Sequence, residues 1–288
     1  MIGIILAFGA VFSWTSACFL WRKQTKYFSA LQFNLIKNLI GLIIFSPILL
    51  TIDFILNSHY IILLFLSGFL GISVADSFYI AALKRLGTRR TLTFDATSPI
   101  FAAFMGSLIL GEAIYIKGWL GIIIISFSLI GISFERNLNE KNLETNLFSK
   151  DGYIYAFLSV FFAVLAALIS RSVLQNSELS PFQTSFIRLL AGFICLIPFF
   201  RLSLFKEIQN LNTKNKSILI FSTILGTNIG ILLQQNVFQL LPVGLGWTLL
   251  STSPVVSIFF AKLEGEVITW KSLLLSGAVV LGVGILFM

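Results

Sequence analysis

Charged residues are scarce in this sequence. They make up 11% of its 288 residues, whereas 57% are hydrophobic, and soluble domains carry about 25% charged residues. The mean hydropathy is +0.95, so the chain has too little polar surface to cover itself in water. This composition excludes an ordinary soluble protein, and it predicts that the lipid bilayer is the solvent of the chain.

Residues that bind metals or perform catalysis are also few. There are two cysteines, Cys18 and Cys195, both in apolar runs, and one histidine, His59, at the edge of a run. Two such thiols form neither a disulfide framework nor a zinc site, and the sequence has no nucleophile–base set. We therefore predict no metal, no cofactor and no enzymatic activity, which disfavours a membrane enzyme.

Long apolar runs dominate the sequence. Ten of them approach the length of about 20 residues that a membrane-spanning helix needs, and long runs without alternation are helical in lipid. They cover residues 2–21, 30–50, 60–83, 91–110, 115–134, 152–170, 181–200, 217–238, 244–262 and 268–288. We expect ten transmembrane helices.

A repeated marker divides the chain into two halves. The segment from Thr97-Ser98-Pro99 to Gly111-Glu112 recurs as Thr252-Ser253-Pro254 to Gly265-Glu266, and a marker repeated at such a period indicates two structural copies. We predict repeats at 1–134 and 151–288, joined by the polar linker 135–150. Five crossings are an odd number, so the second copy starts on the other side of the membrane. The predicted fold is an all-α membrane protein with ten transmembrane helices in two inverted five-helix repeats.

Inverted repeats are typical of secondary transporters, in which the site lies near the bilayer midplane between the copies. A duplicated membrane protein with a purely structural role is the alternative. Pro99 and Pro254 lie within apolar runs, where proline removes a backbone hydrogen bond and kinks the helix. Matched kinks in both halves favour a cavity there, although kinks that serve only packing are an equal alternative.

Three charged residues within the apolar runs form a candidate coupling site. Lys37, Asp76 and Asp95 lie at similar depths from one membrane face, if the helix rises about 1.5 Å per residue. Burying a charged side chain inside a membrane costs free energy unless the charge is paired or hydrated. A proton or cation site with Lys37 between two carboxylates is one interpretation, and a structural ion pair is the other.

Arg188 is the counterpart of Lys37 in the second half and has no acidic residue at its depth. We predict that it binds an anionic substrate group, with snorkelling to the interface as the equal alternative. The remaining predicted substrate-binding residues are polar or aromatic, and they also suit interhelical hydrogen bonds or interfacial packing. They are Trp14, Asn228, Gln234, Gln235, Asn236, Trp247, Ser251 and Thr252. Glu112 and Glu266 are interpreted as interfacial residues at helix ends.

The two Ser-Pro to Gly-Glu segments, with Lys37 and Arg188 near the start of the second helix of each half, resemble the EamA-type ten-helix members of the drug/metabolite transporter superfamily. The resemblance covers essentially the whole chain. It implies export or import of amino acids, other metabolites or drugs, often driven by an ion gradient. Lys37 stands where arginine is usual, and Asp76 and Asp95 match no general family position, so their role is inferred from burial alone.

The sequence thus predicts a transporter of a small polar or amphipathic metabolite in the cell (inner/plasma) membrane. Export, with an amino acid as the first candidate substrate, is what the resemblance implies. Alternating access with ion or proton coupling is the expected mechanism. A sugar-nucleotide or lipid-linked-intermediate carrier, or a non-transporting structural subunit, are the alternatives. We expect a small-molecule substrate and no nucleic acid, because the basic residues that give the net charge of +8 lie in short clusters between apolar runs.

Those basic clusters also predict an orientation. Of the 20 Lys and Arg residues, 16 are assigned to the connections that follow odd-numbered runs. Only Lys117 and Arg171 are assigned to the opposite face, and Lys37 and Arg188 lie within runs. The positive-inside rule makes these connections cytoplasmic and both termini external. The family resemblance implies cytoplasmic termini instead, and we favour the charge count.

Overall fold

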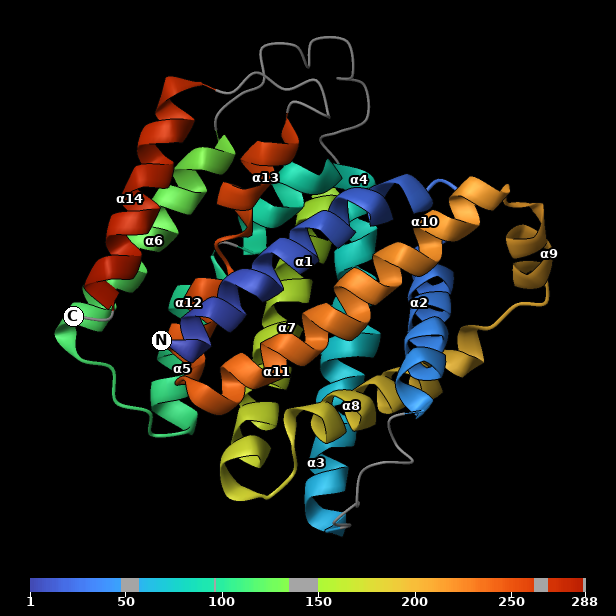
Figure 1. Cartoon of the computed structure of the whole chain (residues 1–288), viewed down its shortest axis with the longest axis horizontal. Coiled ribbons are helices and arrows are strands. Elements are labelled where there is room, and N and C mark those ends of the chain that lie inside the picture. Colours follow the sequence, from blue (N-terminus) through green and yellow to red (C-terminus); the bar gives the residue numbers. More distant parts are fainter. Residues whose placement is uncertain (48–56, 96, 135–149, 262–268, 287–288) are drawn as a thin grey trace.

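The computed structural model describes residues 1–47, 57–95, 97–134, 150–261 and 269–286 (Figure 1). These residues are helical and contain no strand. The first half comprises α1 (Ile2–Gln24), α2 (Ala30–Phe45), α3 (Ser58–Gly68), the π-helix η2 (Phe69–Ala75), α4 (Asp76–Asp95), α5 (Ser98–Ile109) and α6 (Ile116–Phe134). The second half comprises α7 (Lys150–Asn176), α8 (Pro181–Leu196), the 3₁₀ turn η4 (Ile197–Phe199), α9 (Ser203–Asn210), α10 (Thr213–Thr223), the π-helix η5 (Ile224–Ile229), α11 (Gly230–Leu240), α12 (Val243–Leu250), α13 (Ser253–Ala261) and α14 (Trp270–Leu286).

Several of these helices suit a bilayer. Five helical segments are long and apolar enough to cross a membrane, namely Ile2–Gln24, Ser58–Gly87, Lys150–Asn176, Pro181–Phe199 and Thr213–Leu240. Shorter apolar helices cover Ala30–Phe45, Ser98–Ile109, Ile116–Ile132 and Trp270–Leu286. The all-α, multi-pass membrane fold is thereby confirmed, whereas the count of ten crossings stays a prediction.

The two predicted proline kinks are complete helix breaks. Pro99 and Pro254 each stand second in a new helix, α5 and α13, rather than inside a continuous one. Proline has no N–H to donate and clashes with the preceding turn, so it is favoured in the first turn of a helix. The fourth and ninth apolar runs therefore consist of short helices.

Matched caps start α2 and α8. The Ser29 hydroxyl accepts a hydrogen bond from the backbone N–H of Gln32, and the Gln32 side chain accepts one from the Ser29 N–H. Ser180 and Gln183 form the same reciprocal capping box at α8. A capping box satisfies two N–H groups that a helix start leaves unpaired. The two halves thus share local structure at corresponding positions.

The halves interlock by exchanging equivalent contacts. Helix α1 packs against α10, η5 and α11 of the second half, and its counterpart α7 packs against α3, η2 and α4 of the first half (Figure 1). The pairs α2–α8 and α6–α14 each join corresponding helices of the two halves, and α5 of the first half packs against α12 of the second. Such reciprocal pairing is what a two-fold relation between repeats produces, and it supports the inverted arrangement.

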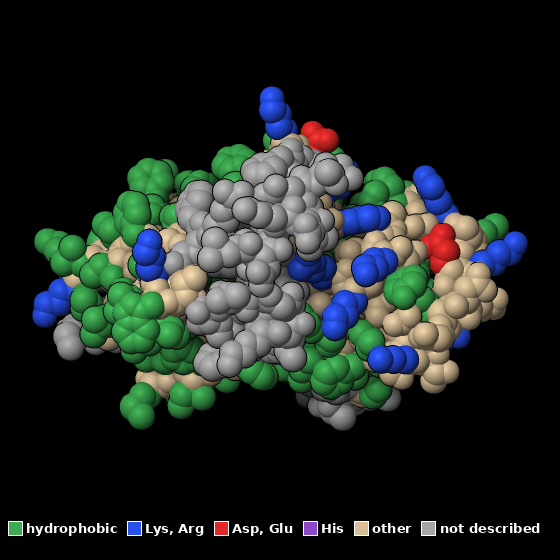
Figure 2. All heavy atoms as spheres, turned by 90° about the horizontal axis from the view of Figure 1, so that it is seen from above, with side chains coloured by type: hydrophobic (Ala, Val, Ile, Leu, Met, Phe, Trp, Pro, Cys, Tyr) green, Lys and Arg blue, Asp and Glu red, His purple; other side chains and the backbone are tan. Residues whose placement is uncertain are grey.

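Basic side chains are unevenly distributed between the ends of the molecule. Figure 2 views the end at which α1 finishes and α10 begins, and Lys and Arg side chains recur across its described part. Lys23, Lys26, Lys84, Lys206 and Lys214 are exposed. The sequence analysis placed Arg171 in a connection at the opposite end, which is wrong, because Arg171 lies within α7 and is buried. The asymmetry of charge is therefore larger than the sequence count implied.

Candidate functional site

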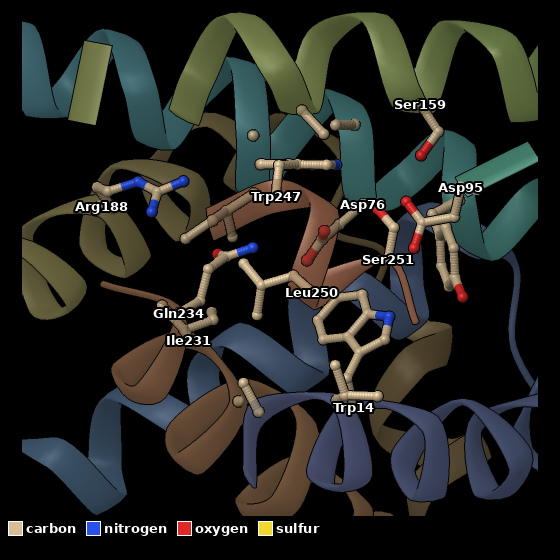
Figure 3. Close-up of a pocket in the computed structure, with 18 residues that line it drawn as sticks. Trp14, Asp76, Asp95, Ser159, Arg188, Ile231, Gln234, Trp247, Leu250 and Ser251 are labelled. Atoms are coloured by element: carbon tan, nitrogen blue, oxygen red, sulfur yellow. The ribbon is translucent and has the colours of Figure 1, made fainter. Parts of the chain in front are cut away.

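A central cavity of about 90 Å³ lies where the two halves meet (Figure 3). Its wall is built from helices of both halves and combines apolar side chains with a few polar ones, which is the usual composition of a small-molecule site. The lining residues are Ala10, Val11, Trp14, Gly71, Ile72, Ala75, Asp76, Tyr79, Asp95, Ser159, Ala163, Arg188, Gly230, Ile231, Gln234, Trp247, Leu250 and Ser251.

Arg188 occupies one end of this cavity (Figure 3). The residue is only 4% exposed, and its Nε and Nη1 atoms have no hydrogen-bond partner in the described part of the chain. A Cβ on Gly71 would lie 3.1 Å from Nη2, and a Cβ on Gly68 would lie 2.2 Å from the Arg188 carbonyl oxygen. The two glycines therefore let α8 approach α3 and η2 closely enough to seat the guanidinium in the cavity wall.

Lys37 and Asp76 form a buried ion pair beside the cavity. Lys37 Nζ donates to Asp76 Oδ2, and Lys37 is fully buried. The ammonium also lies 5.0 Å from the centre of the Trp21 ring, a cation–π distance. The opposite charge and the ring compensate the cost of burying an ammonium in the membrane interior.

Asp95 lies apart from that pair. It lines the end of the cavity remote from Arg188, with Asp76 between them (Figure 3). No ion pair joins Asp95 to Lys37 within the described residues, so the expected three-membered cluster is a pair plus a separate carboxylate. Between Asp76 and Asp95 the helical path of α4 is interrupted at Gly87, whose φ of 79° and ψ of 173° are not helical.

Two tryptophans form opposite parts of the wall. Trp247 stacks on Phe238 with ring centres 5.5 Å apart, and its indole N–H donates to the Ser98 hydroxyl over 2.5 Å. Ser98 in turn lies 3.0 Å from the hydroxyl of Ser251. The helix breaks of the two halves thus meet at one hydrogen-bonded point beside the cavity, and this contact fixes the Trp247 ring.

Trp14 is held by aromatic contacts instead. Its ring centre lies 5.2 Å from that of Trp21 in an edge-to-face arrangement and 5.7 Å from that of Tyr79. Tyr79 also lines the cavity, and its hydroxyl is hydrogen bonded to Cys18 at 3.1 Å. Edge-to-face aromatic pairs stabilise a fold by more than their buried area alone would, so these contacts hold the Trp14 ring in place in the cavity wall.

The π-helices η2 and η5 occupy corresponding positions in the two halves and adjoin the cavity. Gly71 and Ile72 of η2 line it, as does Gly230 directly after η5. A π-helix shifts the backbone hydrogen-bond register and is frequent at functional sites. The Asn34 amide donates to the Ile72 carbonyl over 2.7 Å, and Ser13 donates to the Leu225 carbonyl over 2.7 Å. Side chains thus satisfy carbonyl groups of both π-helices.

Of the predicted substrate-binding residues, Arg188, Trp14, Gln234, Trp247 and Ser251 line the cavity. The other four lie outside its wall and bond to helix backbones or to other side chains. Asn228 donates to the Gly41 carbonyl, Gln235 accepts from Ser170, Asn236 donates to the Leu232 carbonyl, and Thr252 donates to the Leu249 carbonyl. Because these contacts hold α11, η5 and the second break in place, we leave the four residues out of the proposed site.

The sequence analysis missed Tyr79, Ser159 and the two π-helices. Gly71-Ile72-Ser73 in η2 corresponds to Gly226-Thr227-Asn228 in η5. This recurrence of Leu-Gly with a polar residue two positions after the glycine (Ser73 and Asn228) is the signal that was available. Tyr79 and Ser159 carry no such repeat, so only the structure reveals them.

The fold and the cavity define a class, that of helical membrane proteins with a small, partly polar cavity between two repeats. The model of the EamA-like transporter family matches residues 1–134 and 150–288. The chain belongs to the EamA-like transporter family, which confirms the resemblance inferred from the sequence, and it carries two EamA repeats. Members of this class are transporters and are generally not enzymes.

Two similar proteins agree with this assignment. A protein of Archaeoglobus fulgidus (strain ATCC 49558 / DSM 4304 / JCM 9628 / NBRC 100126 / VC-16), described as an uncharacterized transporter, is 26% identical over 270 residues, which are 91% of this chain and 89% of the relative. A solved crystal structure superposes with a TM-score of 0.73 over 98% of this chain and 95% of its own, at 13% identity. At that identity the second likeness shows the fold alone.

Proposed function

We propose that this membrane transporter is a secondary active exporter, in the cell (inner/plasma) membrane, of a small polar or amphipathic metabolite with an anionic group. An amino acid is the first candidate substrate. Binding takes place in the central cavity, and the two repeats expose it to either side of the membrane in turn. Residues 1–134 and 151–288 are the two moving units of this proposal, with 135–150 as their linker.

The observation that carries the proposal is the environment of Arg188. A guanidinium buried to this degree needs an anion, water or carbonyl partners, and its Nε and Nη1 atoms have none among the described residues. Its planar donors suit a carboxylate or phosphate, which they bind through two parallel hydrogen bonds. Gln234 and Ser251 add neutral hydrogen-bonding groups, and Trp14 and Trp247 add flat apolar surface.

Asp95 supports a zwitterionic substrate or a coupling ion. It lies at the end of the cavity opposite Arg188 (Figure 3), so a substrate that bridges the cavity would meet a cationic group and an acidic group. The same carboxylate would accept a proton or cation when no ammonium group is bound. Asp76, neutralised by Lys37, serves mainly to hold η2 and α4 against α2 in this proposal.

The alternative functions, a carrier of larger substrates and a non-transporting structural subunit, can be distinguished from this proposal. A cavity of about 90 Å³ favours a small metabolite over a sugar nucleotide or a lipid-linked intermediate. A non-transporting structural subunit has no use for an unpaired buried guanidinium in a cavity. Substrate-dependent flux into proteoliposomes separates a transporter from such a subunit, and the candidate substrates come from a thermal-shift screen of metabolites on the purified protein.

Replacing Arg188 by Lys tests whether Arg188 anchors the anionic group of the substrate. The variant keeps the positive charge but cannot form the bidentate hydrogen bonds of a guanidinium. The affinity for an anionic substrate should therefore fall tenfold or more, which corresponds to about 1.4 kcal/mol. Arg201→Lys is the matched control, because Arg201 is exposed and outside the cavity. Wild-type affinity in the Arg188 variant, or a transported substrate without an anionic group, contradicts the anchor role.

A further inference from the structure

A second cavity lies on the other side of the helix that carries Asp76. It has a volume of about 550 Å³ and is separate from the central site, with which it shares no lining residue. Its wall comes from the start of α2, from η2 and α4, from Tyr155 of α7 and from the end of α8 with Phe199. We call this second cavity the lateral groove.

The lateral groove follows a stripe along one helix. Phe69, Ser73, Ser77, Ala81 and Arg85 all line it and recur every fourth residue, so they lie along one face of the η2–α4 segment. At about 1.5 Å per residue the stripe is about 24 Å long. One leaflet of the hydrocarbon core is about 15 Å thick, so the groove is long enough to take a full acyl chain.

Charge is confined to one end of the lateral groove. Arg85 is its only charged lining residue, and the exposed Lys84 directly precedes it in the sequence. The guanidinium lies 4.7 Å from the centre of the Tyr155 ring, and no carboxylate among the described residues pairs with it. From Arg85 towards Phe69 the wall is apolar or carries serine hydroxyls, two of which are occupied: Ser77 donates to the Ser73 carbonyl, and Ser29 donates to Gln32.

This distribution matches an amphiphile with one anionic head and one long tail. A compact polar metabolite would leave most of the stripe unfilled and would find one charged group only. Basic pockets between transmembrane helices at a basic membrane face bind anionic lipid headgroups, and Arg85 lies near the end of the molecule that carries Lys84 and the other exposed lysines. The apolar stripe leads away from that end, as acyl chains do.

We propose that the lateral groove is a binding site for an anionic phospholipid. Its phosphate pairs with Arg85, and one acyl chain lies along the stripe from Ala81 to Phe69, between Phe78 and Phe199. Because the bound chain touches α2, η2, α7 and the end of α8, it joins elements of both repeats. The site is independent of the substrate proposed for the central cavity.

Phosphatidylglycerol and phosphatidylcholine with identical acyl chains are the probes. Titrated into purified protein in a neutral detergent and followed by native mass spectrometry, phosphatidylglycerol should bind at least fivefold more tightly. Arg85→Gln should reduce that affinity about fivefold, as expected for about 1 kcal/mol from one basic residue near a lipid headgroup. Lys206→Gln removes the same charge from exposed α9 and should leave the affinity unchanged.

The predicted position of the acyl chain is tested by a separate variant. Ala81→Phe places a ring in the lateral groove and should weaken phosphatidylglycerol binding, while leaving Arg85 in place. This variant decides the proposal even if Arg85→Gln fails to fold. Equal affinity for the two lipids, undiminished phosphatidylglycerol binding in Arg85→Gln, or unchanged binding in Ala81→Phe would each overturn the site.

Discussion

Arg171 donates from Nε to Glu112 Oε1 over 2.9 Å, and the two side chains are only 8% and 7% exposed. Arg171 Nη1 also donates to the carbonyl groups of Phe238 and Gln239, and Glu112 Oε2 accepts from the Val243 N–H over 2.6 Å. The pair therefore ties α7 to the α5–α6 connection and to the turn between α11 and α12. Glu112 lies just after the end of α5, as predicted for a helix-end residue, and it is also a structural partner of Arg171.

Replacing Glu112 by Gln should destabilise the protein by about 3 kcal/mol, because removing one member of a buried ion pair leaves the other charge uncompensated. Thermal unfolding in detergent, followed by tryptophan fluorescence, measures the change. Glu178→Gln is the control, since Glu178 is exposed. An equal, small shift in both variants would mean that Arg171 finds sufficient partners in the backbone carbonyls alone.

A second prediction concerns coupling. Asp95→Asn should abolish accumulation of substrate against a gradient and leave substrate exchange largely intact, because Asp95 lines the cavity without a basic partner among the described residues. Transport in proteoliposomes, with and without an imposed proton or sodium gradient, measures both activities. Normal uphill transport by the variant would assign Asp95 a structural role.

Asp76 should behave differently from Asp95. Asp76→Asn leaves the fully buried Lys37 without its carboxylate, so we expect a loss of stability of about 3 kcal/mol together with any loss of coupling. The double variant Lys37→Gln, Asp76→Asn removes both charges and should recover much of that stability. If the double variant also transports uphill normally, the pair is structural; if it does not, Asp76 takes part in coupling.

Gly71→Ala tests how Arg188 is seated. The added methyl group would lie 2.9 Å from the Ala166 Cβ and 3.1 Å from Arg188 Nη2, so the guanidinium must shift and substrate affinity should fall several-fold. Gly277→Ala is the matched control, because a Cβ there meets nothing within 4 Å. That control should keep wild-type affinity and gain up to about 1 kcal/mol of stability from helix propensity. Equal affinities in the two variants would separate Arg188 from the substrate.

Orientation is testable with reporter fusions. The basic residues gathered at one end of the molecule predict that this end is cytoplasmic and that both termini are external. A C-terminal reporter that is active only in the cytoplasm should therefore be silent, and the same reporter at Lys206 should be active. The reverse result would favour the orientation that the family resemblance implies.

The features most readily predicted from sequence were those that the repeat marks twice. The Ser-Pro segments at Pro99 and Pro254 correctly indicated where helices are interrupted, and Arg188, singled out as the counterpart of Lys37, is buried in the cavity wall. Hydropathy gives the extent of an apolar run but not the face that each residue presents. Arg171 and Gln235 were consequently misplaced, since only packing decides that one meets Glu112 and the other Ser170. The π-helices have no hydropathy signature, because they change the hydrogen-bond register and not the composition.

The difference between Lys37 and Arg188 has an energetic consequence if the two repeats are inverted copies, as the sequence predicts. If the copies were identical, the conformation open to one side and the conformation open to the other would be related by symmetry and equally populated. Lys37 forms an ion pair with Asp76, whereas none of the described carboxylates forms one with Arg188, so the two copies differ in their interactions. Under the proposed alternating access, we therefore expect the empty transporter to prefer one side intrinsically, and an anion bound at Arg188 would change that preference.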